Sequence, residues 1–138
     1  MSFDLYIQSF KNGEPAGVAR SAVRNAFQGA LSEPEHDYWQ LTYGPSESCA
    51  LMLSPLAHLT EHIHNITVVR PCGNHLLWRG IAELLAVGNT VLYFPGGRGP
   101  LLLNPAVASH LPEGMLAALG QPIVVSNGED IAHQISAA

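Results

Sequence analysis

The chain has 138 residues, a length at which one hydrophobic core is usual, so we expect a single domain over residues 1–138. Charged residues make up only 12% of the sequence and hydrophobic residues 47%, so we expect a partner or a second copy to cover some apolar surface. A formal net charge of −5 with only six Lys and Arg provides no basic stripe for phosphates, which argues against nucleic-acid binding.

The sequence also carries expectations about location. The N-terminus lacks the basic region and apolar run of a secretory signal. No segment reaches the ~20 continuous apolar residues that a membrane-spanning helix needs. We therefore expect a cytoplasmic protein that does not bind membranes. In that reducing compartment Cys49 and Cys72 should be free thiols, and the sequence has no C-x-x-C pair for zinc or redox chemistry.

The first third of the chain predicts a strand, a helix and a second strand. Residues 3–10 alternate between apolar and polar side chains, which is the period of a half-buried strand. Apolar residues then recur at helical spacing after Pro15, and they predict a helix over residues 15–30 with Arg20 and Arg24 on its polar side. Residues 38–43 predict the next strand.

The middle of the chain predicts two strands, a helix and a hairpin. Residues 49–53 and 61–70 are β-prone, and a shift of apolar phase across Asn65 indicates a bulge in the second of these strands. Asn74 is the predicted N-cap of a helix that stops near Gly88. Residues 90–94 and 101–103 then predict a hairpin.

The last part predicts a helix between Pro112 and Gly120, a strand over residues 122–125, and a final helix after a capping box from Ser126 to Glu129. The predicted order is β-α-β-β-β-α-β-β-α-β-α. Strand runs interspersed with helices indicate a single α+β domain, in which helices pack on one face of a mostly antiparallel or mixed sheet.

A histidine cluster is the first candidate for chemistry. His58, His62 and His64 lie within seven residues of one another and could ligate zinc or another transition metal. On a helix His58 and His62 would share a face, and on a strand His62 and His64 would. The order His-Glu-x-x-His is missing, so a solvated strand face or turn is the competing interpretation, and we predict no resident cofactor.

Cys72 is the second candidate. It follows Arg70-Pro71, between a predicted strand and a predicted helix, where the helix N-terminus would favour a nucleophilic thiolate. His62, His64 or His75 could act as its base if folding brought them together. The alternative is a compact structural turn.

A glycine-rich loop is the third candidate. Gly96 and Gly97 would allow a backbone to approach an anion, and Arg98 could grip a phosphate or carboxylate. The loop matches neither established nucleotide-binding motif, and a plain hairpin loop is the alternative.

An acidic and aromatic segment is the fourth candidate. Glu35, Asp37 and Trp39 could contact a basic protein partner, with Tyr38 and Tyr43 as further aromatic anchors. A solvated loop followed by core packing would explain the same residues.

Three short motifs resemble those of a family of small bacterial proteins of unassigned function. The resemblance spans most of the chain and implies no functional residue. Its motifs are Ser2-Phe3-Asp4-Leu5-Tyr6, Arg70-Pro71-Cys72-Gly73 and Leu92-Tyr93-Phe94-Pro95-Gly96. In size and acidity the chain also resembles toxin-neutralising immunity proteins.

These features favour a non-enzymatic protein-interaction module that forms a homodimer, and an immunity-type protein is one form that such a module takes. The enzyme alternative is a small hydrolase or transferase that uses His62 and His64. The third alternative is a sensor that binds an anion through Arg98.

Overall fold

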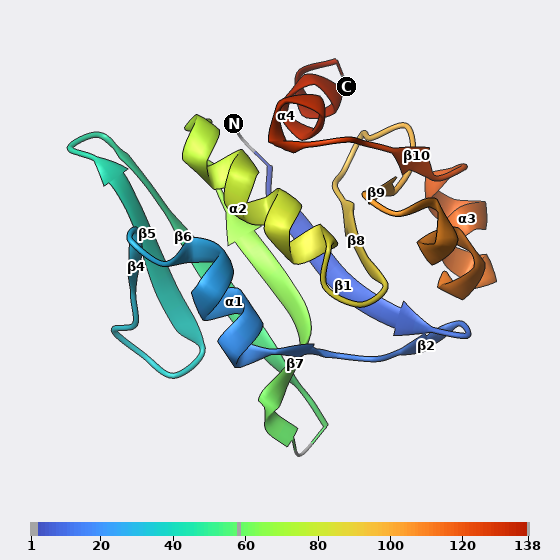
Figure 1. The fold of residues 1–138 in the computed structure, drawn as a ribbon, viewed down its shortest axis with the longest axis horizontal. Helices are drawn as coiled ribbons and strands as arrows, with labels where there is room; N and C mark the ends of the chain where they lie inside the picture. The colour runs from blue at the N-terminus through green and yellow to red at the C-terminus, as the bar shows by residue number, and fades with distance from the viewer. Residues whose placement is uncertain (1–2, 58, 138) are drawn as a thin grey trace.

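The structure, a computed structural model, describes residues 3–57 and 59–137. Its centre is a mixed ten-stranded sheet whose neighbouring strands run in the order β10-β9-β8-β1-β7-β6-β5-β4, with β2 added to β1 and β3 to β7 (Figure 1). The strands are β1 (Leu5–Lys11), β2 (Glu14–Pro15), β3 (Val18–Ala19), β4 (Leu31–Ser32), β5 (Tyr38–Gly44), β6 (Glu47–Leu56), β7 (Leu59–Val69), β8 (Thr90–Tyr93), β9 (Leu101–Leu102) and β10 (Ile123–Val124).

Four α-helices and a 3₁₀-helix accompany the sheet in the described residues. They are α1 (Arg20–Phe27), α2 (His75–Leu85), η1 (Pro105–His110), α3 (Glu113–Leu119) and α4 (Gly128–Ser136). All strand pairs are antiparallel except β9 with β10, which is parallel. The predicted α+β class with a mixed sheet is confirmed, and the predicted element order recurs with three short strands, β2, β3 and β4, and the 3₁₀-helix η1 added.

The main core lies between the sheet and helices α1, α2 and α4, and α2 crosses in front of β7 and β1 in Figure 1. Leu5 and Ile7 of β1 point into it, as do Trp39 and Leu41 of β5, because alternate residues of a strand face the same side. We call this side of the sheet the helix face.

A smaller core lies on the opposite side of the sheet, at its β9 end. Phe10, Val91 and Leu102 point to that side and are covered by Val107 of η1 and Leu111. Since β9 and β10 are parallel, the chain between them must cross over the sheet, and η1 and α3 form this crossover. The helices therefore do not all lie on one face: α1, α2 and α4 share one, and α3 packs on the other.

The predicted helix over residues 15–30 starts too early. Pro15 is extended and pairs with Phe10, and the short strand β3 pairs with β7 before α1 begins. Gly17 has φ +77, and a Cβ there would lie 3.1 Å from the Leu56 side chain, so the backbone requires glycine at this crossing. The strand pairing of Pro15 and of β3 therefore outweighs the helical spacing of the apolar residues in this segment.

Two cap predictions had different outcomes. The Asn74 side chain accepts a hydrogen bond from the Leu76 amide, as expected of the N-cap of α2. The predicted capping box from Ser126 to Glu129 is wrong by one residue, because Asn127 is the N-cap and accepts from the Asp130 amide. An Asn side chain is as good a cap as Ser and here lies one residue closer to the first helical turn.

The predicted bulge in β7 is confirmed. Ser54 pairs with Asn65 and the next residue, Pro55, pairs with Ile63, which leaves His64 as the extra residue of β7.

No helix in the described part of the chain is long and apolar enough to cross a membrane.

Candidate functional site

Part of the sheet has no helix on the side opposite the helix face, among the residues that the structure describes. Strand alternation and register place five side chains there in one row across five neighbouring strands. We call this row the open-face ladder, and it consists of Tyr93 (β8), Tyr6 (β1), Thr67 (β7), Met52 (β6) and Tyr38 (β5).

The ladder is aromatic at one end and exposed at the other. The rings of Tyr6 and Tyr93 stack with centroids 5.5 Å apart. Met52 is 49% exposed and Tyr38 37%, which makes them two of the most exposed large apolar side chains in the described structure. A surface row of this composition is typical of a contact site for another protein.

A polar network flanks the aromatic end of the ladder. The Tyr93 hydroxyl donates to Gln8 Oε1 at 2.8 Å, and the Gln8 amide nitrogen lies 3.4 Å from His64 Nε2. Burial raises the pKa of the Tyr93 hydroxyl, so it stays protonated and remains a donor. Nδ1 of His64 is buried and has no partner in the described residues.

Two of the three clustered histidines, His62 and His64, can be placed in the structure. His62 is exposed on β7 opposite Ala19, His64 lies in the bulge beside Gln8, and His58 lies outside the described residues. No three or more His, Cys, Asp or Glu side chains in the described chain are arranged to hold a metal ion.

Cys72 lies away from two of its three predicted bases, His62 and His64. His62 and His64 belong to the first half of β7 and Cys72 follows its end, and since a strand rises about 3.3 Å per residue, His64 is about 16 Å from Val69. Within the described residues, no hydrogen bond joins Cys72 to a histidine. Its thiol is instead a neighbour of Cys49.

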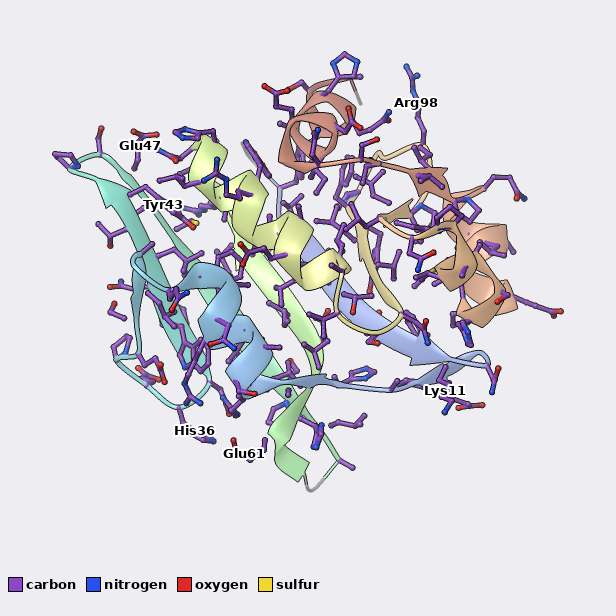
Figure 2. The ribbon with its side chains drawn as sticks, viewed as in Figure 1. Lys11, His36, Tyr43, Glu47, Glu61 and Arg98 are labelled. Carbon is purple, nitrogen blue, oxygen red and sulfur yellow. The ribbon has the colours of Figure 1, made fainter. Side chains whose placement is uncertain are left out.

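The glycine-rich loop has a structural explanation. A Cβ at Gly99 would lie 2.0 Å from the Gln121 carbonyl oxygen, and one at Gly120 would lie 2.8 Å from that of Arg98. The glycines allow this loop to pack against the segment between α3 and β10. Gly96, at φ +81, and Gly97 shape the turn, while the exposed Arg98 side chain points away from the fold (Figure 2).

Most of the candidate side chains in the acidic and aromatic segment form contacts within the chain itself. Asp37 pairs with Arg20, and Glu33 forms a two-bond ion pair with Arg24 in which each bond is 3.0 Å. The Trp39 ring is completely buried, so it cannot anchor a partner. Glu35 is exposed, as sequence reasoning expected of this loop.

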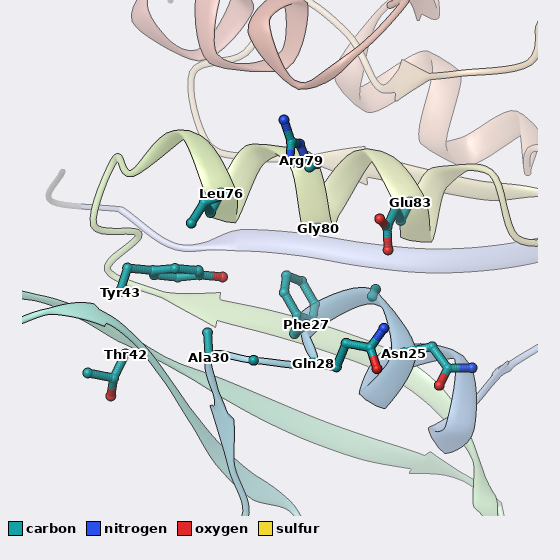
Figure 3. Close-up of a pocket in the computed structure, with 12 residues that line it drawn as sticks. Asn25, Phe27, Gln28, Ala30, Thr42, Tyr43, Leu76, Arg79, Gly80 and Glu83 are labelled. Carbon is teal, nitrogen blue, oxygen red and sulfur yellow. The ribbon is translucent and has the colours of Figure 1, made fainter.

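A cavity of about 470 Å³ lies between α1, α2 and β5 (Figure 3). Its walls include Phe27, Leu76 and Tyr43, and Glu83 points from α2 towards α1 while Arg79 points to the other side of α2. The Tyr43 hydroxyl is buried without a partner in the described residues, and burial raises its pKa. Apart from Tyr43, no predicted site residue lines this cavity.

Sequence reasoning missed most of the open-face ladder. Alternation in β1 puts Tyr6 and Gln8 on the side opposite Leu5 and Ile7, but only the strand order shows that Tyr93, Thr67 and Met52 lie beside them. The adjacency of β8, β1 and β7, strands far apart in the chain, carries no local signal.

Comparisons of this chain with protein-family models, with curated proteins and with solved structures found no match.

Proposed function

We propose that this chain is a non-enzymatic protein-interaction module that forms a homodimer through the open-face ladder and the sheet around it. The observation that carries the proposal is the row with exposed Met52 and Tyr38 on the side of the sheet opposite α1, α2 and α4.

The open face is large enough for a specific contact. Four strands with about seven residues each and β8 with four residues, at ~4.8 Å between strands and ~3.3 Å per residue, give roughly 500 Å² per copy. Two copies would then bury about 1,000 Å², which is close to the ~1,000 Å² that a specific interface requires. Two sheets packed face to face are also a common core arrangement.

Charge favours a second copy as the occupant. The whole chain carries −5, so two copies repel each other, and like charges on the contact surface would add to this repulsion. At open-face positions, β1, β5, β6, β7 and β8 carry no Asp, Glu, Lys or Arg. A neutral surface on an acidic protein suits an identical surface better than it suits a basic partner.

The open face also offers a hollow beside its protruding side chains. A cavity of about 420 Å³ next to Tyr38 has Gln40, Ala50, Val69 and Arg70 among its lining residues. In a two-fold dimer each contact occurs twice, so Met52 of each copy can enter the hollow of the other.

The test is sedimentation velocity over a concentration series of the whole chain and of two variants. We expect the wild type to dimerise, and Met52→Lys to raise the dissociation constant at least tenfold, which is about 1.4 kcal/mol, because it places two cations in the contact. Val124→Lys is the matched control, since Val124 is 54% exposed on β10, away from the ladder, and this variant should still dimerise.

Circular dichroism spectra of the three proteins should coincide, which separates lost association from lost folding. A wild type that stays monomeric at high micromolar concentration contradicts the proposal. So does a dimer that survives Met52→Lys and is lost in Val124→Lys.

We place the module in the cytoplasm as part of the same proposal. The two free thiols support a reducing compartment. An immunity-type role would require a toxin as an additional partner, which co-purification with the product of a neighbouring gene would test.

A further inference from the structure

The two cysteines of the chain meet on the helix face of the sheet. Ala50 pairs with Val69, which places Cys49 beside Arg70 at the end of β7. Arg70 has φ +48, a left-handed conformation that turns the chain away from the strand direction. Cys72 then packs against the same core cluster that contains Cys49.

The two side chains are neighbours in the same core. Cys49 belongs to the main core cluster, Cys72 packs against that cluster, and the two thiols are close enough to influence each other electrostatically. Cys49 is 9% exposed, whereas Cys72 is only partly buried, so a small reagent can reach Cys72 more easily. Both are free thiols in this structure.

We propose that Cys49 and Cys72 are a modification site: a redox pair that forms a reversible disulfide with a low-molecular-weight disulfide, such as oxidised glutathione, as oxidant. The proposal does not depend on the dimer, because both cysteines lie on the helix face.

The chemistry takes two exchange steps. The Cys72 thiolate attacks one sulfur of oxidised glutathione, forms a mixed disulfide and releases one glutathione thiolate. Cys49 Sγ then attacks Cys72 Sγ and releases the second glutathione. The two thiol protons end on the two glutathione molecules, so two cysteines are oxidised and one glutathione disulfide is reduced.

The environments of the two thiols agree with Cys72 as the first nucleophile and Cys49 as the second. Burial, together with the neighbouring Cys72, raises the pKa of the Cys49 thiol to about 12, so Cys49 is a poor first nucleophile. Its contact with Cys72 gives the second step a high effective concentration.

The Cys49–Cys72 disulfide would join β6 to the segment that precedes α2. Because a disulfide restricts the unfolded chain, the oxidised protein should unfold at higher urea concentration than the reduced protein.

The test incubates the reduced full chain with oxidised glutathione under native conditions, traps remaining thiols with an alkylating reagent and measures intact mass and non-reduced peptides. We expect a Cys49–Cys72 disulfide that dithiothreitol reverses. In Cys49→Ser we expect a stable glutathione adduct on Cys72, and in Cys72→Ser at least tenfold slower adduct formation on the buried Cys49.

Three results would overturn the proposal in the wild type, whose folding is not in question. These are a stable glutathione adduct without the internal disulfide, two thiols that remain reduced, and an internal disulfide that forms only after urea is added.

Discussion

Arg20 illustrates how one residue of this chain departs from its local pattern. Its guanidinium is completely buried, donates to the His36 carbonyl oxygen at 2.7 Å and pairs with the Asp37 carboxylate. It also lies 6.0 Å from the centroid of the Trp39 ring. The cation therefore ties α1 to the loop before β5 and is a structural residue.

Removal of the Asp37 carboxylate should destabilise the fold, because it withdraws an anion from a buried cation. Loss of one partner of a fully buried ion pair costs about 3–5 kcal/mol, and we expect about 2 kcal/mol for Asp37→Ala because the Asp37 side chain is 46% exposed. Urea unfolding measures this change in the free energy of unfolding.

Glu35→Ala is the control for this prediction. Glu35 is exposed in the same loop, and its loss should change the free energy of unfolding by less than about 0.5 kcal/mol. Equal effects of the two substitutions would show that the Arg20 pair contributes nothing specific.

The position of Arg20 could not be predicted from its own segment. Helical spacing put Arg20 and Arg24 together on a polar side, and Arg24 is indeed exposed. Arg20 is buried because the loop that carries Asp37 folds over it. Arg20 and Asp37 belong to different predicted segments, so the pattern of neither segment indicates their contact.

At the scale of elements, the packing of α1 on α2 depends on one small residue. A Cβ at Gly80 of α2 would lie 2.6 Å from the Phe27 ring and 3.0 Å from the Ala26 carbonyl oxygen (Figure 3). Phe27 is buried in the main core, so its ring has little room to move. Glycine at this position lets the two helices approach closely.

Gly80→Ala should therefore destabilise the protein although alanine is the better helix former. Overpacking costs about 1–3 kcal/mol, against a gain in helix propensity of at most about 1 kcal/mol. Gly114→Ala in α3 is the matched control: a Cβ there meets nothing within 4 Å, so we expect a gain of about 0.5–1 kcal/mol. Thermal unfolding of both variants would reveal the expected opposite signs, and a gain in both would contradict the close packing.

Elements whose residues show a hydrophobic period were predicted well. Short strands that form only by pairing with a longer strand, such as β2, β3 and β4, were not predicted. The strands β1, β5 and β8 and the helix α2 recur close to their predicted ranges, and so does the bulge in β7. The two-residue strands β2, β3 and β4 exist only because longer strands lie beside them. Such short pairs are too brief to show an alternating pattern.

At the scale of the whole molecule, net charge makes a prediction about the proposed dimer. Two copies that each carry −5 repel one another, and salt screens this repulsion while leaving a neutral contact unchanged. Raising NaCl from about 20 to 300 mM should therefore lower the dissociation constant by about two- to fivefold. Sedimentation at several salt concentrations measures the dissociation constant. A dissociation constant that rises with salt would point to a charged contact instead.

The fold class could be predicted from the order of strands and helices, whereas the site could not. The open-face ladder exists because β1 lies between β8 and β7, and that order depends on long-range pairing. The histidines are candidates because they are close in sequence, but the described residues contain no group of three or more His, Cys, Asp or Glu that could hold a metal ion.

The two faces of the sheet carry different chromophores. Both tryptophans, Trp39 and Trp78, are buried on the helix face, while three of the four tyrosines belong to the open-face ladder. Tryptophan fluorescence should therefore report oxidation of the cysteine pair and remain insensitive to association, which tyrosine signals in near-ultraviolet circular dichroism should follow. One sample can thus be monitored optically for events on each side of the sheet independently.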